Sequence, residues 1–161
     1  MNQDFKEAFE KTRKAGSIAA QALNEVSKIV RPGISTEKID KICYEYISDH
    51  KAYSAPLFYR GYPKSCCTST NHVVCHGIPS DKILKDGDIL NVDVTAFKDG
   101  WHGDTSRMFK IGEVSIKAEK LINVTYESMM KAISIIKDGI HLGDIGSVIQ
   151  KKVEAEGFSV V

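Results

Sequence analysis

The sequence lacks the features that mark membrane-spanning, secreted and strongly charged chains. It contains no run of about eighteen consecutive apolar residues, the minimum for a membrane helix. Residues 1–16 mix charged with apolar side chains, unlike the apolar core of a signal peptide. Its 22 basic and 21 acidic residues give a formal net charge of +1 and form no basic block. We therefore expect a cytoplasmic protein that binds neither nucleic acid nor a membrane surface.

Cysteine is scarce, and its spacing excludes the common structural uses. The four cysteines, Cys43, Cys66, Cys67 and Cys75, do not follow zinc-ribbon spacing, and the adjacent pair cannot easily bridge to itself. We interpret them as reduced thiols. With 161 residues, 42% of them hydrophobic, the chain is long enough to form one globular domain with a core of its own.

Hydrophobic periodicity predicts long helices on either side of a hairpin. Apolar residues recur at helical spacing between Phe5 and Val30, and Ser35 or Thr36 can cap a second helix. Residues 54–79 have the composition of loops and short strands, and two strand-like segments, 88–97 and 101–111, flank turn residues. Two further helices are predicted at about 116–137 and 142–156, with Gly157 as a C-terminal cap. These elements predict an α+β fold.

A segment near each end of the chain follows the same pattern. IVRPGISTEKIDKI, from Ile29, aligns with IIKDGIHLGDIGSV, from Ile135, so that Gly33 lies over Gly139. Any helix-glycine-helix junction can produce such a match. We favour a duplicated helix, helix, strand unit, because the flanking elements recur in order. On this interpretation residues 1–114 form a first half and residues 115–161 begin a second half that the chain does not complete.

Two aspartates interrupt the strand-like segments of the hairpin. Asp93 and Asp104 have apolar neighbours, and a buried carboxylate is costly unless it is paired or binds a cation. A two-residue turn would place both on one face, roughly 7–8 Å apart at the backbone. A three-residue loop would move Asp104 to the other face unless Gly103 forms a bulge. The alternative is a pair of edge-strand aspartates that face solvent.

Carboxylate ligands favour hard or borderline cations, so the pair predicts a site for manganese, iron(II) or cobalt, with zinc also compatible. Two such ions can activate a water or hydroxide as a nucleophile and polarise a carbonyl. Two aspartates do not complete such a site, so further ligands must come from elsewhere. Thr95 and His102 lie on the same hairpin and could support a ligand through hydrogen bonds.

A histidine follows an apolar pair in the stretch STNHVVCHGIPS, residues 69–80. We expect His76 to stand at the end of a buried strand, and Gly77 to leave room for the backbone of a bound peptide. A lone histidine in such a segment is otherwise a hydrogen-bonded core residue.

Taken in order, STNHVVCHGIP, GDILNVDVTAF and GWHGDTSRMF resemble the type I methionine aminopeptidases, and the similarity extends to the closing IQKKVEAEGFSVV. The resemblance implies the pita-bread fold, an antiparallel sheet covered by helices in two pseudo-symmetric halves, here with the second half truncated. It implies metal-dependent removal of the N-terminal methionine from peptides and nascent chains at the ribosome, by an enzyme that is monomeric when complete.

The resemblance also assigns individual residues. It makes Asp93 and Asp104 ligands of two divalent ions (cobalt, manganese, iron(II) or zinc), and it places His76 on the substrate. The pocket for the methionine side chain would be lined by Tyr59, Tyr62 and Cys67, and backbone oxygens of Asn71 and Val73 would bind a monovalent cation.

In this family a histidine and two glutamates complete the metal site in a segment that would follow Val161. We therefore expect the 161-residue chain to be inactive by itself. Two alternatives stay open: a pita-bread homologue that binds peptides without catalysis, and a proline-specific aminopeptidase.

Overall fold

The computed structural model describes residues 3–161, which divide into two compact units. The first unit ends at Val114, and the second comprises Ser115–Val161. Whether these units correspond to halves of a duplicated fold stays a prediction. Within residues 3–161, no helix combines the length and the apolar character needed to cross a membrane.

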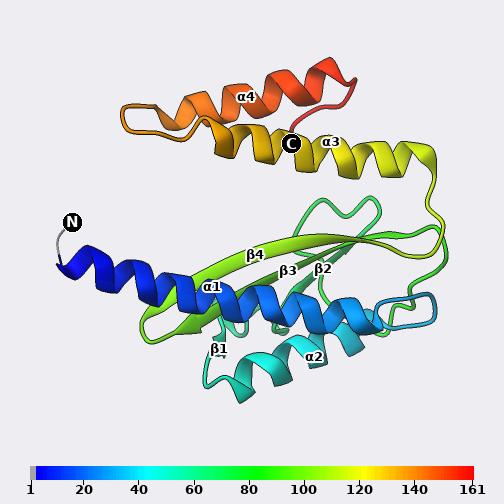
Figure 1. Ribbon diagram of the computed structural model, residues 1–161. Coiled ribbons are helices and arrows are strands. Elements are labelled where there is room, and N and C mark those ends of the chain that lie inside the picture. The colour runs from blue at the N-terminus through cyan, green and yellow to red at the C-terminus, as the bar shows by residue number, and fades with distance from the viewer. Residues whose placement is uncertain (1–2) are drawn as a thin grey trace. The chain divides into compact units, whose positions relative to one another are not determined.

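The first unit is an antiparallel sheet with two long helices on one face (Figure 1). Its helices are α1 (Gln3–Ile29) and α2 (Thr36–Asp49), with a short 3-10 turn η1 (Tyr59–Gly61). Its strands are β1 (Tyr53–Ser54), β2 (Cys67–Thr70), β3 (Ile89–Lys98) and β4 (Trp101–Lys110). Strand β3 is central: it pairs with β4 along its whole length, and with β1 and β2.

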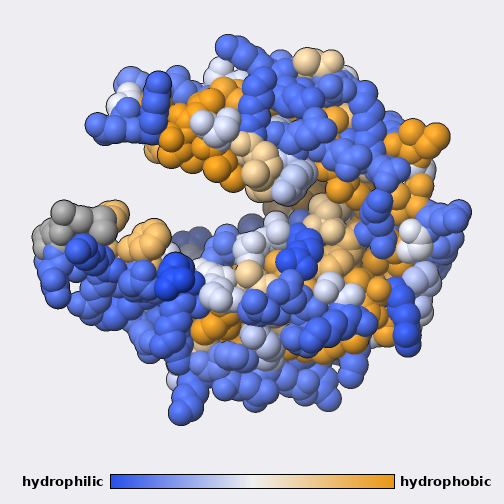
Figure 2. Space-filling view, viewed as in Figure 1, coloured by the Kyte–Doolittle hydropathy of each residue, from blue (hydrophilic) through white to orange (hydrophobic). Residues whose placement is uncertain are grey.

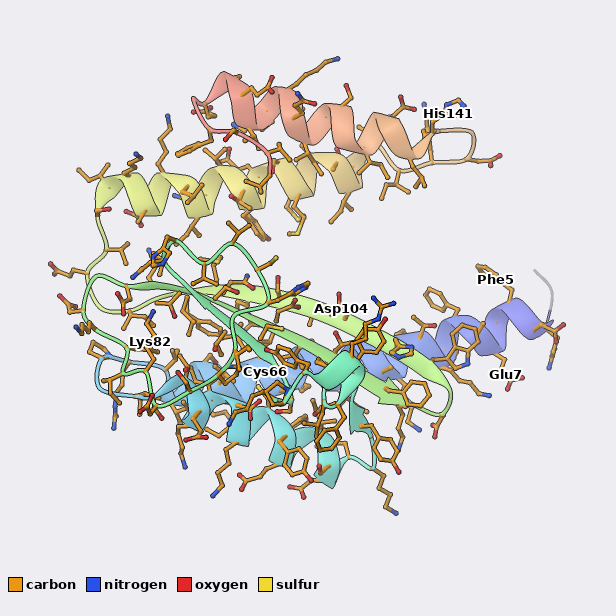
Figure 3. All side chains as sticks on the ribbon, turned by 180° about the vertical axis from the view of Figure 1, so that it is seen from behind. Phe5, Glu7, Cys66, Lys82, Asp104 and His141 are labelled. Carbon is orange, nitrogen blue, oxygen red and sulfur yellow. The ribbon has the colours of Figure 1, made fainter. Side chains whose placement is uncertain are left out.

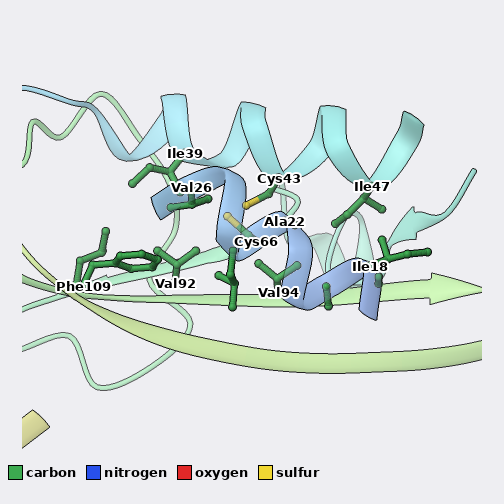
Figure 4. Packing of buried hydrophobic residues seen from close by; sticks show 14 of the residues in the cluster. Ile18, Ala22, Val26, Ile39, Cys43, Ile47, Cys66, Val92, Val94 and Phe109 are labelled. Atoms are coloured by element: carbon green, nitrogen blue, oxygen red, sulfur yellow. The ribbon is translucent and has the colours of Figure 1, made fainter. Parts of the chain in front are cut away.

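The core lies between this sheet and the two helices, as the alternation along β3 requires. Every second residue from Leu90 to Ala96 is buried, while the residues between them are only partly buried. The buried strand residues Val92 and Val94 pack against helix residues such as Val26 (Figure 4). The thiols of Cys43 and Cys66 belong to this cluster, with no exposed surface. The opposite face of β3 is therefore left for other functions.

The helices begin and end close to where the sequence places them. Ser35 caps α2 by accepting a hydrogen bond from the backbone N–H of Lys38 at 3.2 Å. Gly33 and Gly139 both have positive φ, 90° and 85°, so the two aligned junctions share a left-handed glycine.

The second unit is a pair of helices, α3 (Ile116–Ser134) and α4 (Leu142–Ala155). Helix α3 ends before the predicted limit at residue 137. The N–H groups of Ile135 and Ile136 donate hydrogen bonds to the carbonyl groups three residues earlier, as in a 3-10 turn, instead of four residues earlier. Apolar atoms gather over this helix in Figure 2, and its exposed apolar residues include Met129, Met130 and Ile133.

One glycine on β4 allows helix α1 to lie directly against the sheet. A Cβ atom on Gly103 would overlap the main chain of α1 at Ala15 and Gly16. A Cβ on Gly16 would meet nothing within 4 Å. The closeness of α1 to β4 therefore depends on the absence of a side chain at residue 103.

We expect Gly103→Ala to lower the free energy of unfolding by about 1–3 kcal/mol, because the helix must move away from the strand. Gly16→Ala is the matched control, and it should raise stability by about 0.5–1 kcal/mol through its helical propensity. Urea unfolding of both variants measures the difference. Equal stability of the two would contradict the close contact between α1 and β4.

Candidate metal and substrate site

The turn of the β3–β4 hairpin determines which side chains share a face. Asp99 and Gly100 form a two-residue loop with φ of 52° and 87°, the left-handed pair that a tight hairpin requires. Asp93 lies opposite Ser106, and Thr95 lies opposite Asp104. The prediction of a two-residue turn is confirmed. The three-residue alternative is wrong, and the strand pairs through Gly103 without a bulge.

Both aspartates therefore lie on the face of the sheet that the helices leave uncovered. Asp93 is half-buried and Asp104 is exposed. Asp104 is labelled on its strand in Figure 3. Thr95 Oγ1 donates a 2.6 Å hydrogen bond to Asp104 Oδ1, so the predicted contact between Thr95 and a candidate ligand is present. Strand β2 adds Cys67 to the same face, because Cys67 pairs with Asp93. His102 packs instead against Phe97, with 4.7 Å between ring centroids.

The charge on this face is unfavourable without a cation. Burial raises the pKa of Asp93 above its usual value, and the negative charge of Asp104 raises it further. The nearby imidazole of His76 acts in the opposite direction. A carboxylate whose ionised form is disfavoured by burial and by a neighbouring carboxylate is suited to a divalent cation, which would supply the missing positive charge. The oxygen donors of both carboxylates fit the hard and borderline ions predicted from the sequence.

His76 lies in a loop, so the prediction that it ends a buried strand is wrong. Strand β2 stops at Thr70, and residues 73–80 have no regular structure. Val74 is 69% exposed, and His76 has a φ of 54°. Asn71 causes the break: it turns the chain with a φ of 54° and anchors the turn through its side chain. The apolar Val73–Val74 pair was a misleading strand signal.

Gly77 serves a different purpose from the predicted one. A Cβ atom at this position would overlap the carbonyl group of Thr68, so the glycine allows the loop to lie against β2. Thr68 N–H donates to the Gly77 carbonyl at 2.7 Å, and Gly77 N–H donates to Ser69 Oγ at 3.2 Å. The space that the missing side chain leaves is filled by the strand and gives no room to a substrate.

The residues predicted to line the methionine pocket are only partly brought together. Tyr62 and Cys67 lie close enough for each to influence the pKa of the other, and burial is the main reason that the pKa of the Cys67 thiol is raised. Tyr59 is 64% exposed, with the Arg60 guanidinium 5.5 Å from its ring centroid. Tyr62 and Cys67 thus form a half-enclosed corner beside Asp93, and Tyr59 stands at the surface.

The predicted monovalent-cation residues lie on the turn after β2. The Asn71 side chain donates to Asp88 Oδ1 at 2.8 Å and accepts from Ile89 N–H at 3.0 Å. Val73 N–H donates to the Thr70 carbonyl at 3.1 Å. These bonds fix the turn on which the carbonyl groups of Asn71 and Val73 stand. Their role toward a cation stays a prediction.

Asp40, which was not predicted from the sequence, anchors the segment before β2 to helix α2. Asp40 on α2 accepts hydrogen bonds at its Oδ1 from Ser65 N–H at 2.7 Å, Ser65 Oγ at 2.6 Å and Cys66 N–H at 3.1 Å. Nothing in the local sequence distinguishes Asp40 from the other charged residues of its helix. Within residues 3–161, His, Cys, Asp and Glu side chains form no group of three or more arranged to hold a metal ion.

The chain belongs to metallopeptidase family M24, whose profile matches residues 10–161. It is 52% identical over 153 residues to the methionine aminopeptidase of Rickettsia prowazekii, covering 95% of this chain and 59% of the relative. It is 55% identical over 157 residues to that of Escherichia coli K12, covering 96% of this chain and 60% of the relative. The chain thus spans about three fifths of the length of these relatives.

Solved structures agree with this assignment. The crystal structure of the Rickettsia prowazekii methionine aminopeptidase superposes with a TM-score of 0.95 at 51% identity, over 97% of this chain and 63% of that one. The Thermotoga maritima enzyme gives 0.94 at 38% identity, over 96% and 63%. An X-Pro aminopeptidase from Thermotoga maritima gives 0.80 at 22% identity, which shows the common fold alone. The predicted α+β pita-bread fold and the resemblance to methionine aminopeptidases are confirmed.

The charge repulsion on the open face predicts that Asp93→Asn stabilises the metal-free protein at neutral pH. The amide removes a half-buried charge next to Asp104. Because the pKa of Asp93 is raised in the folded state, the destabilisation is absent at low pH and develops as the pH rises above the unfolded-state value. Urea unfolding in a chelator at pH 7 measures this.

Asp81→Asn, in an exposed loop, is the control and should leave stability unchanged. If Asp93→Asn instead destabilised the chelated protein at pH 7, the carboxylate would have to be held by contacts other than a cation.

Proposed function

We propose that this chain forms part of a cytoplasmic, metal-dependent aminopeptidase that removes the N-terminal methionine from peptides and nascent chains. The observation that carries the proposal is the hairpin register, which puts Asp93 and Asp104 on one open face beside the Tyr62–Cys67 corner. Identity above 50% to proteins named methionine aminopeptidase supports this substrate.

Asp93 and Asp104 would hold two divalent ions, drawn from cobalt, manganese, iron(II) and zinc. Ions of this kind activate water and polarise a carbonyl group. The resemblance assigns the remaining ligands to a histidine and two glutamates in a segment that residues 1–161 do not contain. The chain's own contribution is to hold the two carboxylates at a fixed separation, with Thr95 Oγ1 orienting Asp104 by its 2.6 Å hydrogen bond.

His76 would contact the scissile amide. Its side chain is exposed and lowers the pKa of Asp93, which supports a position near the proposed ions; we assign it to the substrate and not to the metal. The Tyr62 ring and the Cys67 thiol would contact the methionine side chain, whose polarisable thioether packs well against aromatic and apolar groups. Tyr59, at the surface, would cover this pocket from outside.

The carboxylate pair gives the first test of this function. In the complete protein, Asp93→Asn and Asp104→Asn should each weaken divalent-metal binding by roughly 100-fold or more, because a charged ligand oxygen becomes a neutral amide. Peptidase activity on Met-Ala-Ser should fall in parallel. Metal titration by calorimetry and release of methionine measure the two effects, and Asp81→Asn serves as the control. A variant with full turnover at limiting metal would contradict the assignment.

His76→Ala should separate substrate contact from metal binding. We expect metal content to remain near that of the wild type, while kcat falls by about 10²–10⁴-fold. Elemental analysis and steady-state kinetics on Met-Ala-Ser give both values. Stoichiometric loss of metal would make His76 a ligand instead.

Assays of the wild type on Xaa-Pro peptides address the remaining alternatives. Cleavage of these peptides in preference to Met-Ala-Ser would favour a proline-specific aminopeptidase. Peptide binding without cleavage would favour a non-catalytic homologue.

A further inference from the structure

The hydroxyl group of Tyr62 joins two segments that are distant in the sequence. It lies 2.9 Å from the Cys66 carbonyl oxygen and 3.1 Å from the Gly77 carbonyl oxygen. Burial raises the pKa of the phenol well above its usual range, so the group keeps its proton and acts as a donor. One partly buried donor thus lies between two backbone acceptors, which leaves its single proton no capacity to donate to a substrate.

On one side of this contact the chain is held rigidly. Cys66 has no exposed surface, and its side chain belongs to the core under the helices. Its N–H group donates to Asp40 Oδ1 at 3.1 Å, and the preceding Ser65 N–H donates to the same oxygen at 2.7 Å. The Cys66 carbonyl is therefore a fixed point that is anchored to both α2 and the sheet.

On the other side lies the loop that carries His76. Gly77 is docked on β2, since its carbonyl accepts from Thr68 N–H and its N–H donates to Ser69 Oγ, and the Tyr62 hydroxyl donates to the same Gly77 carbonyl. His76 immediately precedes Gly77 and has a left-handed backbone, with φ of 54°. The direction of its imidazole therefore depends on where the Gly77 peptide is held.

We propose that Tyr62 is a positioning residue, whose hydroxyl ties the Gly77 carbonyl to the anchored Cys66 peptide and so holds the His76 imidazole over the face of Asp93 and Asp104. The aromatic ring and the hydroxyl then have separate tasks. The ring forms part of the substrate corner beside Cys67, and the hydroxyl keeps the loop in place. The proposal rests on the proposed function in that His76 is the group that meets the substrate.

Tyr62→Phe removes the hydroxyl and retains the ring. In the complete, metal-loaded enzyme we expect kcat on Met-Ala-Ser to fall about tenfold or more, since small displacements of a substrate-orienting group are costly. KM should stay within about twofold and metal content should be unchanged, because the pocket wall and the carboxylates remain. The matched control is Tyr44→Phe on the half-exposed surface of α2, which should behave as the wild type.

A second measurement follows His76 directly and does not depend on turnover. With ¹⁵N-labelled histidine, Tyr62→Phe should shift or broaden the side-chain signals of His76, assigned from their loss in His76→Ala. The signals of His50 and His141 should not change. Gly77→Ala, which forces the loop away from Thr68, should perturb the same signals more strongly.

The outcomes are distinct. A lower kcat at unchanged KM, together with altered His76 signals, supports the positioning role. A raised KM at unchanged kcat would mean that the hydroxyl acts in the substrate pocket, and this would overturn the proposal. Wild-type kinetics with unaltered His76 signals would mean that the hydroxyl does not position the loop, and this would overturn it too. If the wild type released no methionine, the proposed function would be wrong. The positioning role of Tyr62 would still be tested separately, because unaltered His76 signals in Tyr62→Phe would contradict it.

Discussion

The site depends on the tight turn at Asp99–Gly100. Two consecutive residues with left-handed backbone conformation form a two-residue turn. The length of this turn sets the register, and therefore the pairing of every position along β3 and β4. A shift of one residue would turn Asp104 toward α1 and α2, where burial of a carboxylate is costly unless a partner compensates its charge. The same register places Gly103 under α1, so the approach of the helix and the placement of the acid are set together.

The architecture of the first unit followed from local signals that are strong in this sequence. The apolar spacing of α1, the cap at Ser35 and the Asp99–Gly100 turn each act within a few residues, so the sequence was enough to predict them. A two-residue turn was enough to predict Asp93 and Asp104 on one face, because the length of a hairpin turn sets the strand register. The register in turn determines which face of the sheet each side chain occupies.

The loop of His76 was not predictable in this way. Its path depends on contacts between segments far apart in the sequence: Thr68 with Gly77, Tyr62 with both Cys66 and Gly77, and Asp40 with Ser65. Val73 and Val74 have strand propensity, but the left-handed turn at Asn71 ends the ladder before they can join it. Gly77 indicated that another group lies close to the backbone at this position. The structure identifies that group as the backbone carbonyl of Thr68.

The four thiols differ sharply in their access to solvent. Cys43, Cys66 and Cys67 are buried, whereas Cys75 is exposed and precedes His76 directly. Alkylating reagents and maleimide dyes will therefore attach first at Cys75, on the loop that carries the imidazole. A fluorophore at this position offers a probe of loop movement during peptide binding, and preparations handled without a reducing agent will accumulate oxidation damage beside the site while the interior thiols are spared.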